Sequence, residues 1–232
     1  MNNNVLQIKI KERLNKLASM DYDNLECWQI AEAFNKAQIE WVRRQVHGNN
    51  ALREGDESSK MSIDDLQKLL TDVALPGTQR EVFYESATLP ADYLFFKRFV
   101  IKAKNDCCPE RRVVAYLAEE ADVDNLLFDS FRKPSFEWGE TFATLGNNRA
   151  RIYTDEQFNV TSLRLVYYRK PRPISFDGCV DIATGNATTN VECEFKDDIV
   201  ELLIEETCLI LAGDIESPLQ IQRTTQNVIR NN

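Results

Sequence analysis

Apolar residues near the start of the chain recur with the period of an α-helix. In residues 5–17, Leu6, Ile10, Leu14 and Leu17 are separated by four, four and three positions, with lysine and glutamate between them. Apolar positions three and four apart lie on one face of a helix. The segment is therefore predicted to be an amphipathic helix.

A second helical pattern follows and ends at Gly48, a residue that commonly terminates helices. Asp23 and Glu26 have the spacing of a capping box and indicate where this helix begins. Its apolar stripe consists of Ile30, Phe34, Ala37 and Trp41. Two helices joined by a short connection predict an antiparallel helical hairpin.

A third helical pattern follows a polar loop at residues 49–60. Ser62 and Asp65 have the types and spacing of a helix N-cap. Apolar residues then recur at helical spacing, at Leu66, Leu69, Leu70 and Val73. Residues 1–75 are therefore expected to be helical apart from their loops.

From about residue 80 to residue 175 the pattern changes to runs of aromatic and β-branched residues, interrupted by prolines and polar clusters. Such runs favour β-strands. Gly146, Asn147 and Asn148 lie between two of these runs, as in a hairpin turn. Residues 122–131 are expected to form a short helix. Counting the runs predicts an antiparallel sheet of about five strands.

After residue 195 the chain returns to a helical pattern. Residues 196–213 are apolar on most faces, which indicates a buried helix, and Asp197 and Asp198 suit its N-terminus. Residues 214–232 are polar with few apolar side chains, so they are expected either to fray or to dock on a neighbouring chain.

These patterns together predict an α+β fold. We expect one domain over residues 1–232, consisting of a helical part (1–75), a mainly β part (80–195), a buried helix (196–213) and a C-terminal arm (214–232).

The composition of the chain argues against several classes of protein. A net charge of −9 argues against general nucleic-acid binding, which needs lysine and arginine at phosphates. The N-terminus has no apolar signal-peptide core, and no run approaches the ~20 apolar residues of a membrane span. Six cysteines without a C-x-x-C pattern are expected to be free thiols in a chain made in a reducing compartment.

Few residue patterns favour an enzyme. His47 is the only histidine, which leaves no set of zinc ligands, and glycine-rich phosphate loops are absent. Asp181, Glu194 and Lys196 resemble the D…ExK pattern of Mg²⁺-dependent nucleases, although a solvated strand end explains them more simply. We expect no catalytic site, cofactor or metal, and keep the nuclease as the alternative.

Other residues are typical of protein interfaces, which are rich in aromatic side chains and arginine. The interface candidates are Trp41, Arg43, Arg44, Arg111 and Arg112, together with an acidic helix face of Asp198, Glu201 and Glu205. The candidate docking arm carries Pro218, Leu219, Ile221, Val228 and Ile229.

Six long stretches carry a family resemblance: KAQIEWVRRQ, LPADYLFFKRF, CCPERRVVAYLAEEADVDNLL, RKPSFEWGETFATLGNNRARIYT, YYRKPRP and VECEFKDDIVELLIEETCLILAGDIES. They resemble the tail structural proteins of crAss-like bacteriophages, in particular the ring proteins of the connector between portal and tail. The resemblance covers roughly residues 20–220.

The resemblance implies a virion protein, made in the bacterial host cytoplasm, that forms a dodecameric ring around a DNA channel. Its partners would be copies of itself, the neighbouring portal and tail rings, and genomic DNA that passes without sequence-specific binding. No membrane partner is implied. Besides the nuclease, a monomeric binding module without a lumen remains an alternative.

Overall fold

The computed structural model describes residues 1–15, 25–47, 64–181, 184–214 and 225–226. The chain forms two compact units, one from residues 1–68 and 171–232 and the other from residues 69–170. We call them the helical unit and the sheet unit. With helices at both ends and a large sheet between them, the fold is α+β, as the sequence predicts. The prediction of one domain stays a prediction.

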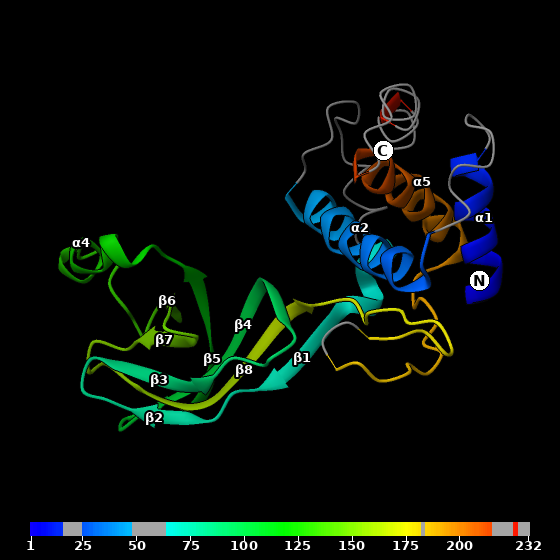
Figure 1. The fold of residues 1–232 in the computed structure, drawn as a ribbon. Coiled ribbons are helices and arrows are strands. Elements are labelled where there is room, and N and C mark those ends of the chain that lie inside the picture. The colour runs from blue at the N-terminus through cyan, green and yellow to red at the C-terminus, as the bar shows by residue number, and fades with distance from the viewer. Residues whose placement is uncertain (16–24, 48–63, 182–183, 215–224, 227–232) are drawn as a thin grey trace. The chain divides into compact units, whose positions relative to one another are not determined.

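The long helices described in the helical unit are α1 (Asn3–Asn15), α2 (Cys27–His47) and α5 (Asp197–Asp214). Figure 1 shows α5 between α1 and α2, and it contacts both of them. Of the helices in the described ranges, none is long and apolar enough to cross a membrane.

The helical stripes predicted from the sequence form the interior of this unit. Buried residues come from α1 (Leu6, Ile10, Leu14), from α2 (Ile30, Phe34, Ala37, Trp41) and from α5 (Ile199, Val200, Leu203, Ile204, Cys208, Leu211, Ala212). The prediction of a buried helix with Asp197 and Asp198 in its first turn is confirmed. Leu17, Asp23, Gly48, the loop at 49–60 and Ser62 lie outside the described residues.

The predicted helix that ends near residue 75 is wrong in its second half. Residues 64–66 are helical and continue into the 3₁₀-helix η1 (Gln67–Leu69), but β1 (Leu70–Ala74) is a strand. Pairing with a distant strand overrides the local helical spacing. In β1 the side chain of Val73 is half-buried, whereas Leu70 is exposed.

The sheet unit contains more strands than predicted, and one pair is parallel. Its eight strands occur in the order β1-β8-β4-β5-β6-β7-β3-β2, and all neighbours are antiparallel except β5 and β6. The remaining strands are β2 (Gly77–Gln79), β3 (Phe83–Thr88), β4 (Tyr93–Asn105), β5 (Cys108–Leu117), β6 (Glu140–Gly146), β7 (Arg149–Tyr153) and β8 (Asn159–Arg169).

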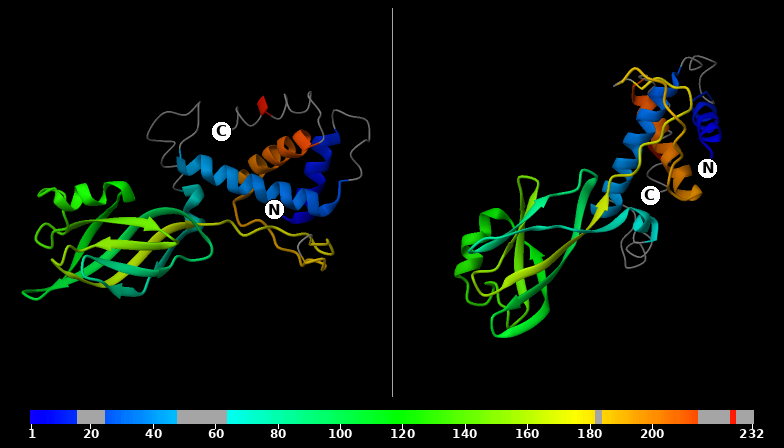
Figure 2. Two further views of the ribbon diagram at one scale, coloured as in Figure 1. Left: turned by 60° about the vertical axis from the view of Figure 1, so that its left-hand side comes forward. Right: turned by 90° about the horizontal axis from the view of Figure 1, so that it is seen from below.

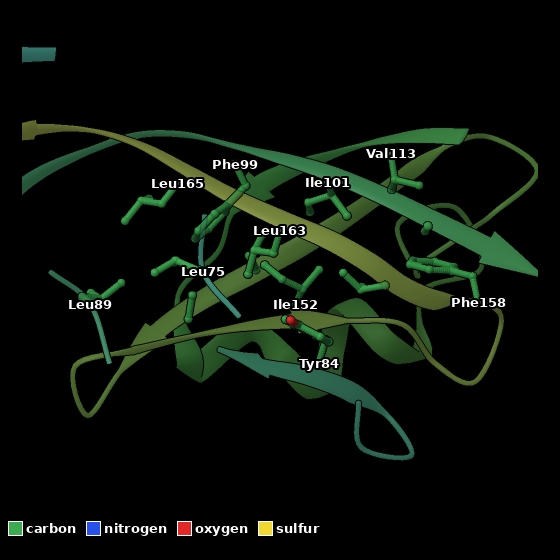
Figure 3. Packing of buried hydrophobic residues seen from close by; sticks show 14 of the residues in the cluster. Leu75, Tyr84, Leu89, Phe99, Ile101, Val113, Ile152, Phe158, Leu163 and Leu165 are labelled. Atoms are coloured by element: carbon green, nitrogen blue, oxygen red, sulfur yellow. The ribbon is translucent and has the colours of Figure 1, made fainter. Parts of the chain in front are cut away.

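The long strand β5 changes partner along its length. Its first part pairs with β4, and Val114–Leu117 pair with β6. The sheet thereby folds over on itself and encloses a core, in which Ile101 and Leu165 from one half face Ile152 from the other (Figure 3). These three side chains are fully buried.

A second, smaller core lies on the outer face of β6 and β7. It consists of Leu126, Phe142 and Tyr153, and Leu126 belongs to α4 (Val123–Phe128), which follows the 3₁₀-helix η2 (Glu120–Asp122). Both turned views show α4 beside the sheet (Figure 2). The short helix predicted within residues 122–131 is confirmed.

The predicted turn between β6 and β7 is also confirmed. Asn147 and Asn148 have φ angles of 49° and 57°. Two consecutive positive φ values define a type I′ turn, whose twist matches that of an antiparallel hairpin, and asparagine tolerates this conformation better than most residues.

The prediction of six free thiols is wrong, because Cys27 and Cys179 form a disulfide. They are separated by 152 positions, and the fold brings their Cα atoms to 6.0 Å. No local pattern could have paired cysteines so far apart in sequence. Cys107, Cys108, Cys193 and Cys208 are not disulfide-bonded.

Thiol titration checks this pairing. Denatured without reductant, the chain is expected to react at four of its six cysteines, and at all six after reduction. A Cys27→Ser variant should show five reactive thiols with or without reductant. Six reactive thiols in the unreduced wild-type chain would contradict the disulfide.

A candidate protein-interaction surface

The sheet unit exposes three large aromatic side chains close together in sequence. Phe128, Phe131 and Trp138 are 87%, 96% and 80% exposed. Aromatic residues usually contribute to folding by burying their large apolar area. Three that remain in solvent within eleven residues mark a candidate surface for protein interaction.

Local hydrogen bonds hold Phe131 in this outward position. The helix α4 ends at Phe128, and the carbonyl of Asp129 accepts hydrogen bonds from the backbone N–H groups of Arg132 and Lys133. The Asp129 carboxylate accepts a further bond of 2.9 Å from the Phe131 N–H. The turn is therefore fixed by Asp129, and it points the Phe131 ring into solvent.

A second turn presents Trp138. The Ser135 hydroxyl accepts a hydrogen bond of 3.2 Å from the Trp138 N–H, and the Ser135 carbonyl accepts one from Gly139. Gly139 has a φ of +70°, and an added Cβ would lie 2.5 Å from the Arg111 guanidinium, so only glycine fits well here. Phe136, in the same turn, is buried.

Arg111, predicted to contact another chain, supports this turn from within. Its guanidinium lies 5.3 Å from the centre of the Phe136 ring and donates a hydrogen bond of 3.3 Å to the Glu137 carbonyl. The side chain is nevertheless exposed, as is Arg112. Arg111 therefore positions the Trp138 turn, and its outer surface remains accessible.

The two turns border a cavity of about 600 Å³. Its wall includes Tyr116, Phe131 and Trp138 together with charged groups of both signs, among them Arg132 and Glu137. Aromatic side chains and arginine are enriched in protein–protein interfaces. We call Tyr116, Phe128, Phe131 and Trp138 with this cavity the aromatic surface.

A second cavity, of about 750 Å³, lies within the helical unit between α2 and residues 172–191. Trp28, Phe176, the disulfide-bonded Cys179 and Asp181 are among its lining residues. Most of the wall is apolar, so the cavity suits an apolar group better than a charged one.

Trp41 does not lie on the surface, contrary to the interface prediction. It is 1% exposed, and its ring makes an edge-to-face contact with Phe195 at 5.3 Å between centroids. Its place in the helical stripe made it a core residue. Arg43, two positions later, is exposed and remains an interface candidate.

Arg44 forms an ion pair inside the helical unit. Its guanidinium contacts the carboxylate of Glu206 on α5, which is 4% exposed. The Glu206 pKa is raised to about 7, because burial and the nearby Glu40 raise it by more than Arg44 lowers it. Arg44 therefore stabilises a buried carboxylate.

The predicted acidic face is also largely used within the chain. Glu201 contacts Lys9 and lies 2.7 Å from Arg13, which in turn lies 2.8 Å from Glu205. These pairs join α1 to α5. Asp198 is exposed.

The three nuclease candidates each have other contacts. Lys196 pairs with Asp64, which raises the pKa of the lysine, and Glu194 accepts a hydrogen bond of 2.9 Å from the Arg172 N–H. Asp181 accepts one of 3.0 Å from the Thr184 hydroxyl. Within the described ranges, no three His, Cys, Asp or Glu side chains converge as metal ligands. The alternative of a nuclease stays a prediction.

Sequence reasoning missed the aromatic surface, although FDSFRKPSFEWGE contained a signal. Its aromatic residues fit neither a helical nor an alternating period and stand among proline, glycine and charged residues. The predicted docking arm of Pro218, Leu219, Ile221, Val228 and Ile229 lies outside the described residues.

No protein-family model matches the chain, and no curated protein sequence matches it.

Proposed function

We propose that this chain is a virion structural protein that assembles into a multimeric ring, dodecameric if it matches the portal, in the connector between a phage head and tail. The observation that supports the proposal is the aromatic surface, whose exposed aromatic side chains and cavity suit contact with another protein chain. The resemblance of residues 20–220 to crAss-like phage ring proteins supplies the kind of assembly.

A ring needs two different faces on each subunit, because each copy contacts its two neighbours through unlike surfaces. The aromatic surface provides one such face. Its aromatic centre would supply most of the contact energy, since buried aromatic side chains dominate interface energetics. Arg43 and Arg112 are exposed residues for the rim of either face.

The charge of the chain suits a channel through which genomic DNA moves. A net charge of −9 per copy repels the phosphate backbone and prevents tight, nonspecific adhesion. The ring would thereby hold the neighbouring portal and tail rings while it lets the genome pass.

Imaging of intact phage particles tests this function. The chain is expected to fit into a closed ring below the portal, with Phe131 and Trp138 covered by an adjacent protein. Particles that lack the chain would contradict the proposal. So would a ring in which the aromatic surface faces solvent.

A further inference from the structure

We propose that the aromatic surface of one copy binds residues 217–232 of a second copy, so that each subunit holds the next by its C-terminal segment. This inference rests on the proposed function, because it names the contact that joins subunits within the ring. It assigns a specific occupant to the surface.

Charge complementarity is the first reason for this occupant. Residues 119–140, which include α4 and both turns of the aromatic surface, contain seven acidic and two basic side chains. The exposed Arg111 beside the Trp138 turn adds a third basic group, so acidic groups remain in excess. Residues 217–232 contain Arg223 and Arg230 and no acidic residue. Opposite charges steer the two segments together and disfavour a wrong partner.

Apolar content is the second reason. The segment carries Leu219, Ile221, Val228 and Ile229 among polar residues, which is too little to form a core of its own. The cavity beside Tyr116, Phe131 and Trp138 has room for aliphatic side chains of this size. Each partner therefore has apolar area that this contact would bury.

Length is the third reason. Residues 215–232 follow α5, and a chain of this length can span at most about 60 Å. A segment of this reach is long enough to cross from one subunit to a neighbour. In such a contact one copy contributes the segment and the other contributes the aromatic surface. The two surfaces therefore differ, as in the heterologous contacts that form rings.

Two full-length variants separate donor from acceptor. The acceptor variant carries Phe131→Ser and Trp138→Ser, and the donor variant carries serine at Leu219, Ile221, Val228 and Ile229. A third chain with Val180→Ser, an exposed apolar residue of the helical unit, serves as a matched control. Circular dichroism and thermal unfolding should show that all three fold like the wild type.

The first measurement titrates a labelled synthetic peptide of residues 214–232 with each chain. The donor variant, whose own segment cannot compete, is expected to bind the peptide at least about tenfold more tightly than the acceptor variant does. A peptide with Arg223→Glu and Arg230→Glu should bind the donor variant several-fold more weakly. Equal binding to both variants, or no binding up to millimolar concentration, overturns the inference.

The second measurement establishes that the contact is between copies. Sedimentation of the donor and acceptor variants should show monomers for each alone and a one-to-one dimer for the mixture. A mixture that stays monomeric, although the peptide binds, would mean that the segment occupies the surface of its own chain, and would overturn the inference. Neither measurement needs the phage particle, so particles without the chain would refute the proposed function separately.

Discussion

Replacing Phe142 with alanine is expected to lower the free energy of unfolding of the sheet unit by about 3–5 kcal/mol. Phe142 is fully buried, and its ring stacks on Tyr153 at 4.6 Å between centroids. It also contacts the small core beneath α4, which includes Leu126. Alanine would leave a cavity that the surrounding strands cannot close, because their hydrogen-bonded ladders fix the backbone.

Urea unfolding followed by circular dichroism measures this loss. Phe131→Ala is the matched control, because it removes the same atoms from a side chain that is 96% exposed. The control is expected to change stability by no more than about 0.5 kcal/mol. Equal losses in the two variants would show that Phe142 is not the core residue described. The comparison also separates stability from assembly, because only Phe131 belongs to the aromatic surface.

A Glu206→Gln variant is expected to lose a pH dependence that the wild-type chain shows. The folded state raises the Glu206 pKa from its ordinary 4.5 to about 7. Between these values the folded chain keeps a proton that the unfolded chain has released. Stability from this group is therefore greatest at low pH, falls as pH rises from about 4.5 to about 7, and is constant above. Over this pH range the free energy of unfolding falls by about 3 kcal/mol, because each pKa unit corresponds to about 1.36 kcal/mol.

Unfolding free energies measured between about pH 5 and pH 8 test this expectation. Relative to the wild type, Glu206→Gln should gain most of those 3 kcal/mol over this range. Arg44→Ala provides the complementary control, because Arg44 holds the Glu206 pKa down and its removal should extend the wild-type decline to higher pH. Parallel curves for the wild type and Glu206→Gln would contradict a buried, proton-retaining carboxyl.

Helices α1, α2 and α5 could be predicted because their apolar residues follow the period of the structure they form. Leu6, Ile10 and Leu14 repeat every four residues and are all fully buried. The type I′ turn at Asn147 and Asn148 was similarly readable, since its conformation depends on those residues alone.

Features that depend on distant partners could not be read in the same way. Leu70 and Val73 have helical spacing with Leu66 and Leu69, yet residues 70–74 pair with β8, about a hundred residues later. The parallel pairing of β5 with β6 and the Cys27–Cys179 disulfide likewise depend on the folded arrangement. Local propensity is a weak prior where such contacts compete with it.

The candidate interface also depends on distant contacts that the sequence does not reveal. Sequence identified Arg44, Glu201 and Glu205 as charged and suited to a partner, but the fold supplies their partners from other helices of the same chain. Conversely, the irregular aromatic pattern around Phe131 is a local signal, but it does not by itself show that the ring stays in solvent. Exposure depends on what the whole fold leaves uncovered, so interface prediction from sequence is less secure than helix prediction.

The helical unit is built from two separate segments of the chain, residues 1–68 and 171–232. This arrangement determines which unit can fold first during biosynthesis. Residues 69–170 leave the ribosome as one uninterrupted segment, whereas α1 and α2 must wait for α5 before their apolar faces are covered. The sheet unit can therefore fold during translation, while the helical unit is completed only after α5 has been synthesised. Nascent chains arrested before residue 197 should then contain a protease-resistant sheet unit and helices that are still accessible to chaperones.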